Sequence, residues 1–161
     1  MDNSYRALND VLVKLFNDIM DIEQDAIITG EFLDITNNDM HIIESVGIDE
    51  PQNMSSIAKK MSVTMGTLTT SMNNLVKKGY VLRERSEEDR RVVYIRLTEK
   101  GIRAYHHHEA FHREMIDAVV KGMNDSEKQV LVTALVQLKG FFVDYRKSHN
   151  YIRLDKKVKQ K

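Results

Sequence analysis

Apolar residues in the first part of the chain recur at the spacings of amphipathic helices. Alternating steps of four and three predict a helix over residues 5–28, whose apolar stripe is Leu8, Leu12, Leu15, Ile19 and Ile22. The sequence "TNND" at 36–39 has the form of a capping box, so it predicts a second helix that ends before Gly47. A turn with the only proline follows, and a short helix is predicted over 54–61.

The next stretch, "TMGTLTTSMNNLVKKGY" at 64–80, is apolar on one side only. Its apolar stripe consists of Leu68, Met72, Leu75 and Val76, and Gly79 has the usual position just after a helix end. The opposite side carries Gly66, Thr67, Thr70, Asn73, Asn74 and Lys77. Exposed helix faces are normally built from better helix formers such as Glu, Lys, Arg and Gln. This face sacrifices helix stability, and the loss calls for a functional explanation.

Beyond Gly79 the period changes from that of a helix to that of a strand. The segments "YVLRERS" and "RVVYIRL" alternate apolar and polar residues, and "EEDR" joins them as a charged hairpin tip. Thr98 then caps a helix that continues to about Met123, and Asp125 or Ser126 caps a last helix. The seam of the last helix is formed by Leu131, Leu135, Leu138, Phe142 and Tyr145.

This order of elements predicts a winged helix-turn-helix. The expected fold class is mostly α with a two-stranded β-wing (α+β), flanked by long N- and C-terminal dimerisation helices. We expect four parts: a dimerisation helix over 1–36, the DNA-binding domain over 37–97, dimerisation helices over 98–146, and a basic, disordered tail over 147–161. In such a fold the polar side of the 64–80 helix faces a DNA major groove, where hydroxyls and amides can bond to base edges and phosphates.

Composition narrows the class of protein. The chain has 161 residues, of which 42% are hydrophobic and 30% charged, as expected for one globular domain or a small domain with oligomerisation helices. Because the chain has no cysteine, disulfides, thiolate metal ligands and a cysteine nucleophile are excluded. No apolar run approaches the roughly 20 residues of a membrane span. The N-terminus lacks the pattern of a secretory signal, so a cytoplasmic location is expected.

The formal net charge is zero, but the charges are segregated along the chain. Residues 1–50 contain twelve acidic and two basic side chains, whereas residues 51–103 contain five and eleven. Residues 104–161 contain seven and eleven. The asymmetry indicates a surface for a polyanion in the middle of the chain, kept apart from an acidic end.

A family resemblance is carried mainly by "YVLRERSEEDRRVVYIRLTEKG". Its Asp-Arg-Arg tip, apolar strand and Leu-Thr-x-x-Gly sequence resemble the wing of the MarR family of bacterial transcription regulators. The resemblance extends from about residue 5 to residue 146. The segments "VTMGTLTTSMNNLVKKGY", "RSEEDRRVV" and "FHREM" are similar to the branch that represses fatty-acid-synthesis genes, for which a long-chain acyl-acyl-carrier protein acts as corepressor.

The resemblance implies roles for individual residues in DNA binding. Asp89 and Arg91 match the wing-tip pair, in which the arginine enters a minor groove and the aspartate holds its loop. The recognition-helix face would comprise Thr64, Gly66, Thr67, Thr70 and Asn74. Phosphate contacts would come from Lys77, Arg83, Arg85 and Arg90.

The first and last helices carry more apolar surface than one chain of this size could cover. In the MarR family such terminal helices interleave with those of a second chain, so the resemblance implies a homodimer. The two recognition helices of a dimer lie about one helical turn of DNA apart, which predicts an inverted-repeat operator in double-stranded DNA.

Three hypotheses for an effector stay open: a long acyl chain, zinc, and another small lipophilic molecule. An acyl chain would lie between the first, second and fifth helices, and the candidate lining residues are Phe16, Met20, Ile27, Met40, His41, Ile43, His108, Phe111, His112 and Met115. Alternatively, zinc would bind His41, His108 and His112, because the last two are four residues apart on one helix face, and Glu23 could add a ligand. This set resembles the histidine site of zinc-sensing MarR repressors, but those sensors use additional carboxylate or cysteine ligands, and this chain has no cysteine. Without zinc, no cofactor is expected, and histidines and methionines that merely pack in the core are the remaining interpretation.

Other classes of function find less support in the sequence. No nucleophile elbow, phosphate loop, HExxH motif or paired carboxylates are present, so an enzyme is not expected. The terminal heptads alone would fit a coiled-coil interaction protein, but a scaffold has no use for an arginine-tipped hairpin. We expect DNA and a second copy of the chain as partners, acyl-acyl-carrier protein as a further candidate, and no membrane.

Overall fold

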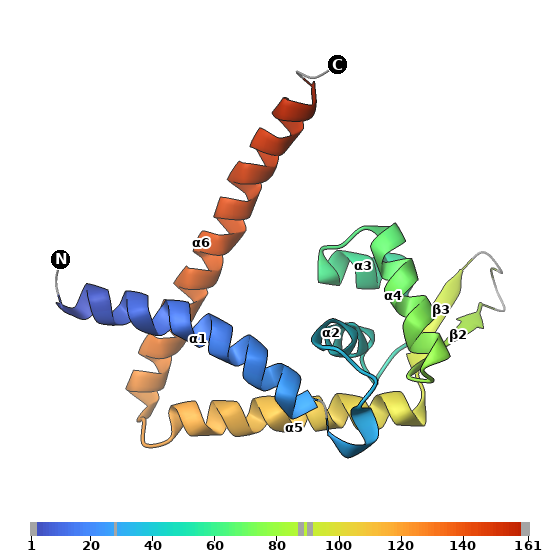
Figure 1. Cartoon of the computed structure of the whole chain (residues 1–161), viewed down its shortest axis with the longest axis horizontal. Coiled ribbons are helices and arrows are strands. Elements are labelled where there is room, and N and C mark those ends of the chain that lie inside the picture. Colours follow the sequence, from blue (N-terminus) through green and yellow to red (C-terminus); the bar gives the residue numbers. More distant parts are fainter. Residues whose placement is uncertain (1–2, 28, 87–88, 90–91, 159–161) are drawn as a thin grey trace. The chain divides into compact units, whose positions relative to one another are not determined.

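The computed structural model describes residues 3–27, 29–86, 89 and 92–158, with the backbone alone for Met20 and 150–158 (Figure 1). The chain forms two compact units, Met1–Glu114 and Met115–Lys161. The first contains α1 (Asn3–Ile27), η1 (Gly30–Phe32), α2 (Asn37–Val46), β1 (Gln52–Asn53), α3 (Met54–Met61), α4 (Met65–Lys77), β2 (Val81–Arg85) and β3 (Val93–Leu97). Helix α5 (Glu99–Val120) continues into the second unit, which also holds α6 (Asp125–Val158).

Capping side chains explain where three of the helices begin. Thr36 and Asp39 form the expected capping box at the start of α2. The side chain of Asn53 accepts a hydrogen bond from the backbone of Ser56 at the start of α3, at 2.8 Å. Thr64 caps α4 by accepting from the backbone of Thr67 at 3.2 Å. The predicted bounds of α2 and α3 are confirmed.

The sheet has one strand more than the sequence predicted. Strands β2 and β3 form the expected antiparallel hairpin, and β1 adds to the free edge of β3, giving the order β1-β3-β2. The pairs Gln52–Ile95 and Asn53–Tyr94 join β1 to β3. The expectation of a two-stranded wing was therefore incomplete. Two residues cannot show a period-two pattern, and the segment becomes a strand only because β3 lies beside it.

The last helix is also longer than predicted. The sequence placed its end at residue 146 and a tail over 147–161, whereas α6 continues to Val158. Two side-chain pairs connect residues on either side of the predicted helix end and stabilise the helix there. Asp144 forms an ion pair with Lys147 at 3.6 Å, and the ring of Tyr145 stacks on His149 at a centroid distance of 3.8 Å.

The hydrophobic core lies in the first unit. The buried residues include Ile57 of α3, Leu68, Met72 and Leu75 of α4, Tyr80 just before β2, Ile95 of β3 and Ala104 of α5. The predicted apolar stripe of α4 is buried except at Val76, which is 38% exposed. Because Val76 lies at the border of the α4 stripe, it turns to the surface. Burying each large side chain stabilises the fold by about 1.5–3 kcal/mol.

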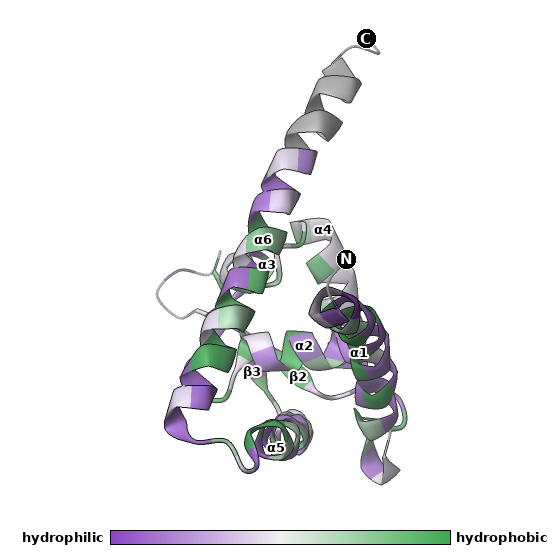
Figure 2. Ribbon diagram, turned by 90° about the vertical axis from the view of Figure 1, so that its left-hand side faces the viewer, coloured by the Kyte–Doolittle hydropathy of each residue, from purple (hydrophilic) through white to green (hydrophobic). Residues whose placement is uncertain are grey.

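Helices α1 and α6 expose apolar side chains, which Figure 2 shows as green segments along each helix. On α1 the exposed set is Tyr5, Leu8, Val11, Val13, Leu15, Phe16 and Ile22. On α6 it is Val130, Val132, Leu135, Val136, Phe141, Phe142, Val143 and Tyr145. Exposed apolar patches of this kind mark interaction surfaces. In the described part of the chain, no helix has the length and apolar character that crossing a bilayer requires.

Candidate nucleic-acid interface and effector site

Helix α4 separates its apolar and polar sides as the sequence predicted. Its apolar side is buried through Leu68, Met72 and Leu75. The predicted DNA-reading residues are all exposed: Thr64, Gly66, Thr67, Thr70, Asn73, Asn74 and Lys77. The helix is therefore held by one side and presents small polar groups on the other.

The hydroxyl groups of this face are organised by the helix itself. The Oγ1 atoms of Thr64 and Thr67 lie 2.9 Å apart, and the hydroxyl of Thr70 donates to the carbonyl of Gly66 at 3.3 Å. A Cβ atom at Gly66 would meet only Thr64 Oγ1, at 3.9 Å. Packing within the chain therefore does not require a glycine at position 66, and the small residue leaves room for an external group.

The structure pairs two residues to which the sequence assigned separate contacts. The guanidinium of Arg83 on β2 donates to Oδ1 of Asn73 on α4 at 2.7 Å. Both residues remain exposed, as do Arg85 and Lys77. Arg96 on β3 forms an ion pair with Glu84 on β2 at 3.1 Å. Because successive side chains of a strand point to opposite faces, Glu84 lies on the other face of the hairpin from Arg83. The hydrogen bond orients Arg83 relative to the recognition helix.

At the tip of the wing, Asp89 belongs to a tight turn. Its backbone N–H donates to Oγ of Ser86 at 3.3 Å, and its carbonyl accepts from the backbone of Val92 at 2.9 Å. Arg90 and Arg91 lie outside the described residues. Their assignment to the DNA backbone and the minor groove stays a prediction.

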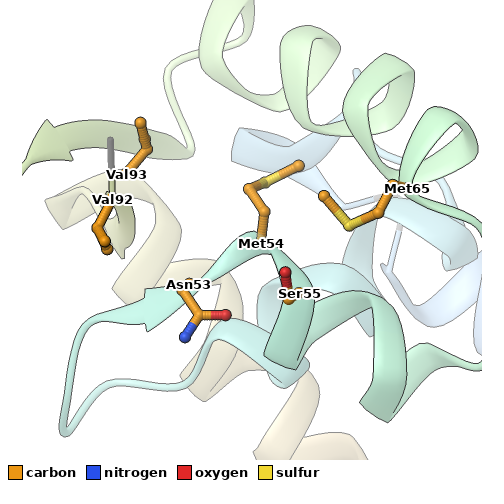
Figure 3. A pocket seen from close by; sticks show the side chains of 6 residues that line it. All are labelled: Asn53, Met54, Ser55, Met65, Val92 and Val93. Atoms are coloured by element: carbon orange, nitrogen blue, oxygen red, sulfur yellow. The ribbon is translucent and has the colours of Figure 1, made fainter. Parts of the chain in front are cut away.

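A pocket of about 520 Å³ lies beside the first turns of α3 and α4 (Figure 3). The side chains of Met54 and Met65 point toward each other there. The other lining residues are Asn53, Ser55, Val92 and Val93. None of these was among the predicted effector residues. Because three separate segments contribute to the pocket, no local sequence pattern reveals it.

The histidine cluster is the second site that the structure assembles. His108 is completely buried, with Nε2 2.9 Å from Oε1 of Glu23 on α1 and Nδ1 2.8 Å from Oε1 of Glu44 on α2. His112 Nε2 lies 3.6 Å from the same Glu23 oxygen. His41 Nδ1 lies 3.5 Å from Oε2 of Glu44. Glu44 was not among the predicted site residues, although its position three residues after His41 could have indicated it.

The electrostatics of the cluster favour charged side chains. Hydrogen bonds from His108 and His41 lower the pKa of Glu44 to about 2. Burial disfavours a charged His108, but the hydrogen bonds to Glu44 and Glu23 outweigh it and raise the pKa of this histidine. The hydrogen bond to Glu44 likewise raises the pKa of His41. Since only an imidazolium donates from both ring nitrogens, two carboxylates at His108 match its protonated form.

The remaining effector candidates are dispersed among several environments. Ile27, Met40 and Ile43 are buried in the core. Phe111 is partly buried, and its ring stacks on His108 with a centroid distance of 6.4 Å. Phe16 is half exposed on α1, the side chain of Met20 lies outside the described residues, and Met115 begins the second unit. An acyl-lining role for this set stays a prediction.

Known proteins resemble this chain in sequence and in fold. A model described as the MarR family matches residues 35–93. The crystal structure of FabT from Streptococcus pneumoniae, solved in complex with DNA, is 38% identical, has a TM-score of 0.79, and is matched over 87% of this chain and 98% of its own.

Two relatives of known sequence bear the names of transcriptional regulators. The uncharacterized HTH-type transcriptional regulator YhjH of Bacillus subtilis is 31% identical over 85 residues, which is 53% of this chain. The HTH-type transcriptional regulator SarZ of Staphylococcus haemolyticus is 39% identical over 69 residues, which is 43% of this chain. The matches span about half the length of these relatives, 49% and 47%. Both the family and the relatives are transcriptional regulators and not enzymes. Since the chain matches FabT over nearly its full length at 38% identity and has the predicted winged helix, it belongs to the MarR family of transcriptional regulators.

Proposed function

We propose that this protein is a cytoplasmic, homodimeric repressor that binds an inverted-repeat operator and controls genes of fatty-acid synthesis. The observation that carries the proposal is the similarity to FabT, which was solved bound to DNA. The polar, exposed face of α4 and the exposed Arg83 and Arg85 of the wing support the same function.

The exposed apolar faces support a dimer. Leu8, Leu15 and Ile22 follow each other at seven-residue spacing on α1, and their exposed fractions lie between 47% and 62%. A second copy would remove these side chains from water, as in other symmetric dimers. Two recognition helices at a fixed distance would then select two half-sites about one turn of DNA apart.

Long-chain acyl-acyl-carrier protein is the effector that we propose. Two likenesses support it: the similarity to FabT, and the resemblance of "VTMGTLTTSMNNLVKKGY", "RSEEDRRVV" and "FHREM" to the branch that represses fatty-acid-synthesis genes. An effector that binds only when the two recognition helices have the spacing of the operator half-sites would raise operator affinity. It would do so by increasing the population of dimers with that spacing.

The experiment is a fluorescence-anisotropy titration with the DNA upstream of the protein's own gene and a scrambled duplex of equal length. We expect tight binding to the first duplex and weak, salt-sensitive binding to the second. Acyl-acyl-carrier protein should tighten the specific complex, and the same carrier without an acyl chain is the control. Equal affinity for both duplexes at low salt would refute DNA recognition, whereas equal effects of the two carriers would refute only the acyl effector.

Zinc sensing is a second candidate function, favoured by the cluster of Glu23, His108 and His112. Their ligand atoms all lie within 4.8 Å of one another. Tetrahedral zinc with bonds of about 2.0–2.1 Å separates its ligand atoms by about 3.3 Å. The separations of 2.9 and 3.6 Å from Glu23 Oε1 to the two histidine Nε2 atoms bracket that value. Glu44 at Nδ1 would orient His108 as an outer carboxylate partner.

Isothermal titration with zinc chloride alone tests this candidate on metal-free protein. We expect saturable binding that His112→Ala weakens strongly. His106→Ala is the matched control, because His106 lies on the same helix, is exposed, and pairs with Glu109 outside the cluster. Equal zinc binding by the two variants would rule out this site.

A further inference from the structure

The turn that follows the recognition helix α4, residues 78–80, is held by hydrogen bonds from several elements. Lys78, Gly79 and Tyr80 end the helix in a Schellman motif: the backbone of Tyr80 donates to Leu75 and that of Gly79 to Val76, both at 3.0 Å. The positive φ of 77° at Gly79 suits this motif. The C-terminal end of α4 therefore has one defined backbone conformation.

The start of α5 binds all three carbonyl groups of this turn. The hydroxyl of Thr98 donates to the carbonyl of Gly79 at 2.6 Å, and the backbone N–H of Thr98 donates to that of Tyr80 at 3.0 Å. Nζ of Lys100 donates to the carbonyl of Lys78 at 3.2 Å. These contacts join the turn to the first residues of α5.

Gly101 allows the close approach on which these contacts depend. A Cβ atom at this position would lie 2.1 Å from the carbonyl oxygen of Tyr80. Any larger residue would have to push the turn away from α5. The Leu-Thr-x-x-Gly sequence thus has a geometric role in joining α5 to the recognition helix.

The segment before α2 and the first turn of α2 hold the side chains of the same turn. Nζ of Lys78 donates to Oδ2 of Asp39 at 2.8 Å, and Asp39 is 6% exposed. The hydroxyl of Tyr80 donates to Oδ1 of Asp34 at 2.6 Å, and Lys100 lies 3.5 Å from the other oxygen of Asp34. Residues 78–80 are thus held from two sides, by residues 34–39 and by residues 98–101.

The opposite end of α4 is held differently. The side-chain hydrogen bonds of Thr64, Thr67, Thr69 and Thr70 stay within the helix and its cap. Leu68 and Met72 pack in the core, but apolar contacts are not directional. A helix of this length is about 20 Å long, so a tilt of roughly 10° at its fixed end would move the other end by about 3 Å. Such a movement would misplace the hydroxyls relative to base edges.

We propose that residues 78–80 are the fixed point that sets the direction of the recognition helix, and that Lys78 is a positioning residue for operator recognition, unlike its neighbour Lys77. This inference rests on the proposed operator binding. Lys77 is exposed on the polar face, where it can reach a phosphate, whereas the ammonium group of Lys78 is engaged by a buried carboxylate. Both residues are lysines, so only their surroundings distinguish their roles.

The test compares Lys78→Met with Lys77→Met as the matched control. Affinities for the operator duplex and for a scrambled duplex are measured between about 50 and 300 mM salt. Losing a phosphate contact at Lys77 should weaken binding to both duplexes and reduce the salt slope by about 1. Lys78→Met should lose about tenfold or more in operator affinity, keep the wild-type affinity for the scrambled duplex, and keep the wild-type salt slope. Lys78→Arg, which can still pair with Asp39, should restore operator binding.

Thermal melting and sedimentation confirm that each variant is folded and has the wild-type mass. If Lys78→Met does not fold, Thr98→Val and Thr98→Ser take its place, because only the serine keeps the hydroxyl that binds Gly79. Thr98→Val should then lose operator preference and Thr98→Ser should retain it. The inference is overturned if Lys78→Met behaves like Lys77→Met or like the wild type, or if the two Thr98 variants bind alike. A wild-type protein without operator preference would instead refute the proposed function itself.

Discussion

The winged helix-turn-helix buries its apolar side chains, whereas the terminal helices expose many of theirs. In the first region, Leu68, Met72 and Leu75 of α4 are at most 1% exposed, and the outer face of the helix is polar. On α6, Leu135 and Phe142 belong to the predicted seam, yet each is about half exposed. One region completes its core within a single chain, whereas the other leaves an apolar seam at the surface.

In the dimer that we propose, this difference separates the element that binds DNA from the elements that would set the distance between two DNA-binding domains. By the proposed function, one folded winged helix-turn-helix with a polar outer face would bind one operator half-site. Exposed seams gain stability only when another chain covers them, and that association would fix the distance between two DNA-binding domains. The comparison predicts that the two regions can be damaged independently.

The largest effect is expected from breaking the α6 seam. The double variant Leu135→Glu, Phe142→Glu places charges where a second copy would bury apolar side chains. We expect a monomer by sedimentation and a loss of operator affinity of about 10²–10⁴-fold, because two linked sites bind far more tightly than one. Thr133→Glu is the control, since its position is about 200° around the helix from Leu135. A monomeric variant that binds operator normally would contradict the role assigned to the seam.

The next effect sharpens the contrast within α4 itself. Leu75→Ala removes a fully buried side chain and should lower the free energy of unfolding by about 2–5 kcal/mol. Val76→Ala, one residue further and 38% exposed, should cost less than about 1 kcal/mol. Urea unfolding followed by circular dichroism measures both values. Equal costs at the two positions would show that the buried side of α4 has been assigned wrongly.

A smaller effect concerns the wing, whose tip residues Arg90 and Arg91 lie outside the described part of the chain. The sequence predicts that Arg91→Ala weakens operator binding by about 1–3 kcal/mol and leaves the dimer intact. Arg96→Ala is the control, because Glu84 already neutralises Arg96. Anisotropy titrations with the operator duplex compare the variants. Normal binding by Arg91→Ala would remove the wing tip from the interface.

The smallest effect concerns the pH dependence of the contact between Asp34 and Tyr80. The hydrogen bond from Tyr80 and the nearby Lys100 hold the pKa of Asp34 below its usual value. The stability that the ionised group contributes is therefore complete above its unfolded pKa of about 3.9, and it is lost as the pH falls through the lower folded value. Asp34→Asn keeps an acceptor for Tyr80 but removes the charge.

Thermal melts from pH 7 to pH 2 compare this variant with the wild type. We expect a small, constant difference in Tm between about pH 5 and 7 that shrinks below about pH 4. A difference that stays constant to pH 2 would show that the carboxylate charge of Asp34 does not contribute.

Local signals carried much of the fold prediction. Thr36 marked the start of α2 in the sequence, because a cap acts on a backbone N–H only a few residues away. The β2–β3 hairpin followed from period-two alternation in neighbouring segments. Strand β1 was missed for the same reason, since its two residues have a partner more than forty residues later.

The functional sites were harder to predict than the fold, because their residues have partners that are distant in the sequence. His108 and His112 were recognised from their spacing on one helix, but Glu23, 85 positions before His108, stood only as an added candidate and Glu44 was overlooked. The polar face of α4 was predicted correctly as exposed, whereas the bond between Asn73 and Arg83 was not foreseen. The predicted base, phosphate and effector contacts stay predictions.

The sequence by itself determined which segments are helical, which face of α4 is polar, and that the chain belongs with MarR regulators. Periodicity and capping are local, so a linear pattern contains them. Only the tertiary structure decided which of two adjacent lysines is bound to Asp39 and which is exposed. It alone brought Thr98 and Gly101 against the end of α4, because the direction of a hydrogen bond and the room for a Cβ atom depend on how distant segments pack.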